Sequence, residues 1–349
     1  MKRILFSLVL LGITGCDRAP EPPRAPDVAD SAGIRVVQNT TSLWRSGEEW
    51  KVSEEPTISI GSFEGTEEYQ FVDIVDATRL SGGRIAIADA GTKSVRVFAL
   101  TGTFLKTLGG PGFGPGEFQD PRSLLSLEGG RVQVWDGTLF RSTVFTEGGD
   151  LVSAEAVDLA TIAKAIDPPL YPASLEPLPD GGFLVRLIEK AGVGKSGGVK
   201  ETSYPVGRFR RQSGALRVSS DLMKVDTVMF FADVEQLAVE APWGVWPIEP
   251  PLARRTWIAQ GGTPHRICIG EQQAPEIACF QNGGSLTLLR WSATDARATE
   301  AEISAWRQEI ARDFGQKLSR EDIFRMLELV PAPEVRPPHS SIHLDPSGT

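Results

Sequence analysis

The sequence predicts an all-β fold built from repeated small β-sheets, as in a β-propeller. The first observation is internal similarity: a shift of 47 residues aligns positions 80–84 (LSGGR) with positions 127–131 (LEGGR) without a gap. The second is the alternation of side chains within each copy, as in positions 85–89 (IAIAD), which is typical of a β-strand. Similarity at a fixed period marks stacked supersecondary units, and each copy holds enough short antiparallel strands for about one propeller blade.

The two clearest repeat units span about residues 71–117 and 118–164. Asp89 and Asp136 occupy the same position in the two units, directly after a predicted strand. Such a carboxylate can accept backbone N–H groups in the turn that follows the strand. Alternatively, the two carboxylates line a central channel and bind a divalent cation. Since a turn requirement recurs from blade to blade, we interpret both as turn residues.

Later repeats are harder to recognise. Residues 178–185 (LPDGGFLV) resemble another turn and second strand, and a further candidate blade spans residues 227–291. Residues 33–60 contain short alternating segments that we expect to supply outer strands and close the ring.

A glycine-rich segment carries a family resemblance. Positions 108–118 (LGGPGFGPGEF), followed by Pro121, resemble the inter-blade signature of NHL-type six-bladed β-propellers. The resemblance is specific over residues 71–152. It implies a six-bladed propeller over residues 34–349, in a bacterial lipoprotein family whose members are mostly uncharacterised. The last residues resemble the beginning of another blade, so we expect a chain that stops inside a blade, with its C-terminal blades truncated. The alternative is a natural end whose last strand pairs with the N-terminal one.

The N-terminus resembles a bacterial lipoprotein leader. Two basic residues precede an apolar run at positions 4–11, which is too short to cross a bilayer but suits a secretory signal. Positions 13–16 (ITGC) resemble a lipobox, whose cysteine receives a lipid. We therefore expect a signal peptide over residues 1–15, a lipid on Cys16 that binds the membrane, and a bacterial cell envelope location, at the periplasmic face or the cell surface. An ordinary signal peptide with an unrelated cysteine is the alternative.

Residues 16–33 are predicted to form a tether between the lipid and the folded body. The segment contains Pro20, Pro22, Pro23 and Pro26. Proline lacks the backbone donor and fixes φ, so this stretch suits neither a helix nor a central strand.

A helical insertion is expected over residues 299–330. Thr299 and Glu302 have the spacing of a capping box, and Ile303, Trp306 and Ile310 follow at helical intervals. A second helix is predicted over residues 319–329.

Cys268 and Cys279 lie on the two arms of a predicted hairpin. In an exported protein a disulfide is the default pairing for two such cysteines. Free buried thiols and a metal site with His265 are the alternatives, although a zinc site needs four ligands and no second pair is near.

The composition excludes several classes of protein. The 349 residues are 41% hydrophobic and 23% charged, which argues against a disordered, collagenous or multi-span membrane chain. The formal net charge is −9, so binding driven by phosphate neutralisation, as to nucleic acid, is not expected.

The ligand is not identified by any motif. Trp243 and Trp246 stand in a proline-rich segment and are candidates for ligand contact, although packing over a blade is the more ordinary role. No catalytic residue, metal ligand or cofactor site is predicted. We expect a non-catalytic binding or scaffold module for an unknown protein, peptide or glycan; the alternative is a metal-dependent hydrolase or lyase of the lactonase-like propeller type.

Overall fold

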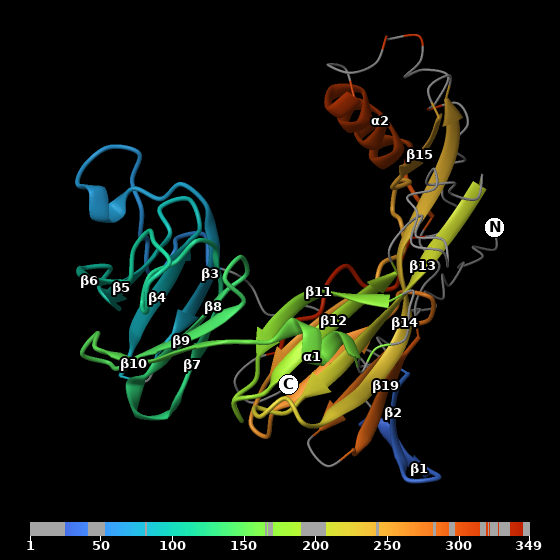
Figure 1. The fold of residues 1–349 in the computed structure, drawn as a ribbon. Helices are drawn as coiled ribbons and strands as arrows, with labels where there is room; N and C mark the ends of the chain where they lie inside the picture. The colour runs from blue at the N-terminus through green and yellow to red at the C-terminus, as the bar shows by residue number, and fades with distance from the viewer. Residues whose placement is uncertain are drawn as a thin grey trace, which may run out of the picture.

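The computed structural model describes residues 25–40, 53–80, 82–164, 166, 170–189, 207–241, 244–281, 284–292, 297–314, 319, 321, 327 and 336–344. About half of these residues lie in β-strands, which form four sheets (Figure 1). The mostly-β class predicted from the sequence is thus confirmed. In this part of the chain no helix is long and apolar enough to cross a bilayer.

The first two sheets are built from the two sequence repeats. Each is a four-stranded antiparallel meander in which strands adjacent in sequence are adjacent in the sheet. The first contains β3 (Ile74–Arg79), β4 (Arg84–Asp89), β5 (Ser94–Ala99) and β6 (Phe104–Leu108), and the second contains β7 (Pro121–Ser126), β8 (Val132–Asp136), β9 (Arg141–Phe145) and β10 (Leu151–Ala156). Short 3₁₀ helices lie at Glu67–Tyr69 and Glu128–Gly130.

The third sheet has five strands, and two of them are much longer than those of the repeats. It contains β11 (Leu170–Pro177), β12 (Phe183–Glu189), β13 (Gly207–Val218), β14 (Val225–Ala241) and β15 (Gly244–Ile248). The blade predicted to start at residue 227 is therefore placed wrongly, because residues 227–241 belong to β14. The cause is length: β14 has 17 residues and pairs with β13, so the third sheet continues past residue 227 and the strands of the next sheet begin at Trp257.

The fourth sheet joins the two ends of the described chain. It contains β16 (Trp257–Gly261), β17 (Arg266–Gly270), β18 (Glu276–Gln281) and β19 (Leu286–Trp291), followed in the sheet by β2 (Ile34–Asn39) and β1 (Asp27–Ser31). Figure 1 shows β2, in blue, beside β19, in orange, and the two strands pair in parallel.

Strand β1 begins inside the segment predicted as a tether, so the tether expected over residues 16–33 is too long at its C-terminal end. All four prolines of that segment precede Asp27, and the residues after it are free to pair. The two turn residues between β1 and β2, Ala32 and Gly33, both have positive φ, as a tight two-residue hairpin requires. The result is an exposed edge strand.

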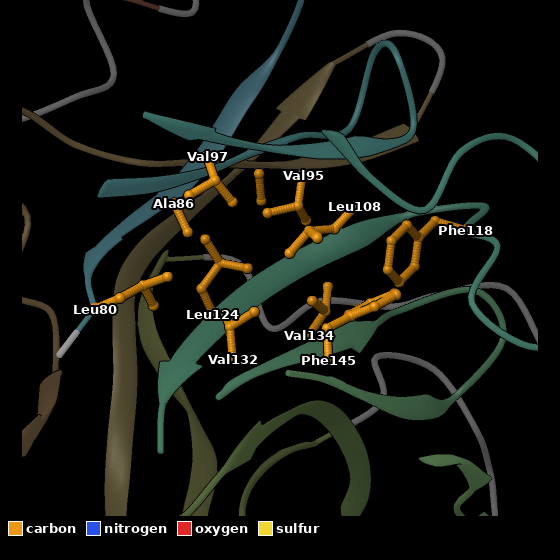
Figure 2. Packing of buried hydrophobic residues seen from close by; sticks show 11 residues of the cluster. Leu80, Ala86, Val95, Val97, Leu108, Phe118, Leu124, Val132, Val134 and Phe145 are labelled. Atoms are coloured by element: carbon orange, nitrogen blue, oxygen red, sulfur yellow. The ribbon is translucent and has the colours of Figure 1, made fainter. Parts of the chain in front are cut away.

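Apolar faces of successive sheets pack against each other, which gives the propeller-type arrangement. Figure 2 shows the first interface, where Val95 and Leu108 of the first sheet meet Val132 and Phe145 of the second. The second interface joins Trp135 to residues of the third sheet, and the third joins that sheet to β17. Hydrophobic clusters therefore join the first sheet to the second, the second to the third and the third to the fourth.

The first strand of each sheet lies nearest the common axis. Strand β7 lies against both β3 and β11. A β-bulge recurs at the start of three of these strands, where the register shifts between Ile74 and Asp76, Pro121 and Ser123, and Pro172 and Ser174. Bulges increase local twist and redirect the side chain that follows. The bulges thus give Asp76 and Ser123 equivalent places in their sheets.

Two helices complete the described fold. Helix α1 (Leu159–Lys164) follows β10, and helix α2 (Glu300–Phe314) lies beside β15 (Figure 1). At the start of α2 the Glu302 carboxylate accepts the Thr299 N–H at 2.8 Å, and bonds from Thr299 and Arg336 lower the pKa of Glu302 to about 2. Trp306 Nε1 donates to the carbonyl of Glu249 at 3.0 Å and ties the helix to the end of β15. The second predicted helix, over residues 319–329, falls mostly outside the described residues.

Phe118 gives a test of the interface between the first two sheets. Its side chain is 0% exposed and packs edge-on against Phe145, so Phe118→Ala is expected to lower the free energy of unfolding by about 3–5 kcal/mol. Urea denaturation measures this change. Phe113→Ala is the control: Phe113 lies in the same loop and is 74% exposed, so its loss should cost about 0.5 kcal/mol or less. Equal costs would contradict the assigned packing.

Candidate functional site: an axial cavity

A cavity of about 690 Å³ lies where the first strands of the four sheets converge. We call it the axial cavity and define it by its polar lining. The polar lining groups come from β3, β7, β11, β16 and the turn after β16, namely Asp76, Thr78, Ser123, Ser126, Glu176, Gln260, Thr263 and His265. Residues from all four sheets thus meet at one place, although up to 189 positions separate them in the sequence.

Glu176 is the central acidic group of the axial cavity. Gln260 Nε2 donates to Glu176 Oε2 at 3.1 Å, across the junction of the third and fourth sheets. Burial raises the pKa of Glu176, and the Asp76 carboxylate also raises it; the Gln260 hydrogen bond and the charge of Arg186 act in the opposite direction. The site therefore holds a carboxylate whose ionised form is poorly stabilised by the protein alone.

The other polar atoms of the axial cavity differ in whether they have a hydrogen-bond partner. Asp76 is engaged, since its Oδ2 accepts the Leu124 N–H at 2.7 Å. Ser123 Oγ and Gln260 Oε1, in contrast, are buried without a hydrogen-bond partner among the described residues. Buried polar groups in proteins are nearly always satisfied, so the two unpaired atoms beside the partly buried Glu176 carboxylate are available to a ligand.

The charge of the axial cavity is negative. Burial lowers the pKa of His265, Arg217 lowers it further, and Asp180 opposes the shift, so the imidazole is neutral at neutral pH. The remaining charged side chains that line the cavity are Asp76 and Glu176. Such a lining favours a cation or a ligand rich in hydrogen-bond donors.

A metal centre has no ligand set in the described part of the chain. No three His, Cys, Asp or Glu side chains there group closely enough to hold a metal ion. The lactonase-like alternative, with Asp89 and Asp136 as channel ligands, places those two carboxylates wrongly, because neither lines the axial cavity.

Asp89 and Asp136 are instead fully buried. Each lies at the end of the second strand of its sheet and accepts hydrogen bonds from the backbone just before the first strand. Asp89 accepts the backbone N–H groups of Asp73 at 2.9 Å and Gly91 at 3.1 Å. Asp136 accepts those of Gln119 at 2.7 Å and Leu139 at 2.7 Å. Burial opposes ionisation of Asp89, but hydrogen bonds from the N–H groups of Asp73 and Val72 and from Thr92 outweigh it and lower its pKa.

The third and fourth sheets have other residues at or near the position of this aspartate. The fourth sheet uses Gln272, whose Oε1 accepts the N–H of Arg255 at 2.7 Å, two residues before β16. The third sheet has Leu187 at the end of the matching stretch of β12, opposite Pro172 of β11. The aspartate predicted to recur is therefore confined to the two clear repeats within the described sheets.

Cys268 and Cys279 lie directly opposite each other on β17 and β18, with Cα atoms 4.1 Å apart and the two sulfur atoms joined in a disulfide. Both side chains are buried in the fourth sheet. His265 lies instead at the axial cavity.

Other candidate residues are placed less fully. Cys16 and Trp243 lie outside the described residues. Trp246 belongs to β15, where it pairs with Val239. Ligand contact by these tryptophans therefore stays a prediction.

The axial residues were not identified from the sequence. One signal existed: Asp76 and Ser123 are separated by the 47-residue repeat and occupy its first strand. Glu176 and Gln260 gave no comparable signal, because the third and fourth sheets do not align with the first two.

The disulfide predicts a thiol count. Denatured, unreduced full chain carrying Cys16→Ser should show no free thiol, and two should appear after reduction. Replacing both Cys268 and Cys279 by alanine is expected to lower stability by about 2 kcal/mol or more, because the unfolded chain regains a loop. Titration with a thiol reagent decides the first point, and two free thiols before reduction would contradict the pairing.

The raised pKa of Glu176 predicts a pH-dependent stability. The folded protein keeps this proton to a higher pH than the unfolded chain, whose glutamates titrate near 4.5. Stability should therefore fall as the pH rises from about 4.5 through the folded-state pKa. Glu176→Gln should remove this fall, as measured by urea unfolding across pH 4 to 8. Glu64→Gln, on an exposed loop, controls for loss of one charge, and an unchanged pH profile in Glu176→Gln would contradict the assignment.

Comparisons with known proteins show only remote likeness. No family model and no curated protein matches the chain. A candidate exported protein from Bacteroides fragilis is 9% identical, with 79% of this chain and 92% of that one covered and a TM-score of 0.34. Virginiamycin B lyase from Staphylococcus aureus is 12% identical, with 62% and 84% covered and a TM-score of 0.28. Regucalcin, a calcium-binding protein from Agrobacterium tumefaciens, is 10% identical, with 68% and 88% covered and a TM-score of 0.29. At these values the likenesses support no functional conclusion, and the propeller-type architecture rests on the sheet order and the packing between sheets.

Proposed function

We propose that this protein is a lipid-anchored, non-catalytic binding module of the bacterial cell envelope, and that the axial cavity is its ligand site. In this proposal the four described sheets belong to an NHL-type propeller that has six blades when complete. The leader, with its basic residues, short apolar run and Cys16, supports export and anchoring.

One observation carries the proposal. Ser123 Oγ and Gln260 Oε1 are buried without a partner in the described structure, and both line the same cavity as the Glu176 carboxylate. Leaving buried polar atoms unpaired costs about 1–3 kcal/mol each, so a chain that keeps two of them at one place gains something else from them. A bound ligand that donates hydrogen bonds satisfies all three groups.

The lining selects the chemistry of the ligand. A primary ammonium has three donors and a positive charge, which match an acidic site with a carboxylate, an amide oxygen and a hydroxyl. Its ion pair with Glu176 also stabilises the ionised carboxylate that burial disfavours. A peptide or a glycan that carries such an amine fits the site, whereas an anionic ligand meets two carboxylates.

The test uses two small probes of similar length and opposite charge. Putrescine, a diamine, is expected to bind the full-length chain carrying Cys16→Ser in isothermal titration, and succinate is not. Glu176→Gln should weaken putrescine binding by about tenfold or more, because it removes a charge-assisted hydrogen bond. Binding should strengthen as the pH rises through the pKa of Glu176.

The control variant is Glu64→Gln, which removes one exposed carboxylate that does not line the cavity and should leave putrescine binding unchanged. Equal affinity for putrescine and succinate, or equal loss in the two variants, would show that any binding is general charge attraction.

A further inference from the structure

We propose a second ligand site, for a neutral saccharide unit, in a cavity between the second and third sheets. This cavity has a volume of about 570 Å³ and lies against β8, β9 and β10 on one side and Phe183 with the turn before it on the other. We call it the inter-sheet cavity. Its proposed ligand differs from the amine assigned to the axial cavity, and neither proposal depends on the other.

The internal repeat shows that this cavity replaces an apolar interface. In the first sheet, Ala86, Val95 and Leu108 face the second sheet and are buried in the first hydrophobic cluster. A shift of 47 residues places Gln133, Ser142 and Glu155 at the same positions of the second sheet. Strand pairing agrees with this match, since Val95 lies opposite Leu108 and Ser142 lies opposite Glu155. The same face is thus apolar in one sheet and polar in the next.

The polar groups are buried as core residues are. Gln133 is 6% exposed and Ser142 is 9% exposed, and Gln133 Nε2 donates to Ser142 Oγ at 2.5 Å. Polar side chains at packing positions are less stabilising than the apolar residues of the neighbouring repeat, and an unfilled space beside them forfeits packing contacts as well. Departures from a local pattern of this kind occur at functional sites.

The two sheets nevertheless remain joined next to the cavity. Trp135, two residues further along β8, packs edge-on against Phe183 with ring centroids 5.4 Å apart. Phe183 also lines the cavity, so this contact holds the two sheets together beside it. The cavity therefore lies beside a packed aromatic pair, and turn residues such as Asp180 and Ser220 complete its lining.

The lining matches a saccharide. Ser126, Gln133, Ser142 and Ser153 provide hydroxyl and amide groups that both donate and accept hydrogen bonds, as sugar hydroxyl groups do, and Phe183 adds an apolar surface. The volume lies within the usual range for small-molecule sites, about 300–1,000 Å³. Three acidic residues, Glu128, Glu155 and Asp180, outnumber Arg131 at the same cavity, which disfavours an anionic sugar.

The experiment measures saccharide binding by the full-length chain carrying Cys16→Ser. The probes are cellobiose, maltose, N,N′-diacetylchitobiose and, as the anionic member, glucuronic acid, each tested up to about 20 mM by saturation-transfer NMR and titration calorimetry. At least one neutral probe is expected to bind, and glucuronic acid is expected to bind more weakly.

Two variants locate the site. Gln133→Ala combined with Ser142→Val restores the residues of the first repeat and should weaken the bound probe by about tenfold or more, with the circular dichroism spectrum unchanged. Thr143→Val is the matched control, because Thr143 is fully buried on the same strand but pairs with Val134, whose side chain packs toward the first sheet. It should leave the affinity unchanged.

A further control separates the two sites. Glu176→Gln changes the axial cavity and should leave saccharide binding as it is, since Glu176 does not line the inter-sheet cavity. The proposal is overturned if no neutral probe binds, if the double variant binds as tightly as the parent, or if Thr143→Val loses as much affinity as the double variant.

Discussion

Burial between successive sheets is the constraint on which the rest of this structure depends. A strand directs alternate side chains to opposite faces, so a sheet that is apolar on both faces is stable only between two neighbours. The second sheet buries apolar side chains on both faces, although its face toward the third sheet also carries the polar Gln133 and Ser142: Val134 and Phe145 pack on the first sheet, and Trp135 packs toward the third. Each sheet must therefore stand beside the next, and their first strands come together at one axis. The axial cavity follows from this arrangement, because the residues that end up facing the axis belong to four different sheets.

The first two sheets could be predicted from the sequence because they share the 47-residue period and the same aspartate at the end of the second strand. Asp89 and Asp136 each collect backbone donors from the segment that precedes the first strand, and this geometry fixes where the strand begins. The fourth sheet meets that demand with Gln272, and β13 and β14 of the third sheet extend to 12 and 17 residues. When the aspartate is replaced and the strand lengths change, the 47-residue period is lost, although successive sheets still pack against each other. A periodic pattern therefore revealed the fold class but could not fix the boundaries of the later sheets.

The candidate site could not be predicted in the same way, for a physical reason. Strand alternation reveals which residues share a face, whereas the axial cavity depends on which sheets are neighbours and how their first strands are shifted. The bulge before Asp76 and Ser123 is a register feature, visible only when two strands are paired. Glu176 and Gln260 meet across two sheets, at a hydrogen bond of 3.1 Å. The cysteines were easier, because a hairpin places its two arms opposite each other whatever the rest of the chain does.

Differences between the repeats carry more functional information than their similarities. Positions that agree, such as Asp89 and Asp136, perform structural work that every such sheet needs. Other equivalent positions carry different residues, such as Val95 and Ser142. Val95 packs in the hydrophobic cluster between the first two sheets, whereas Ser142 lacks this packing role, so its polar side chain reflects another constraint. A serine at a packing position weakens the interface, yet the Trp135–Phe183 contact keeps the sheets together beside it. The aromatic contact thus offsets the stability that the polar residues cost at the interface between the second and third sheets. The second sheet can therefore keep its position while part of the same face lines the inter-sheet cavity.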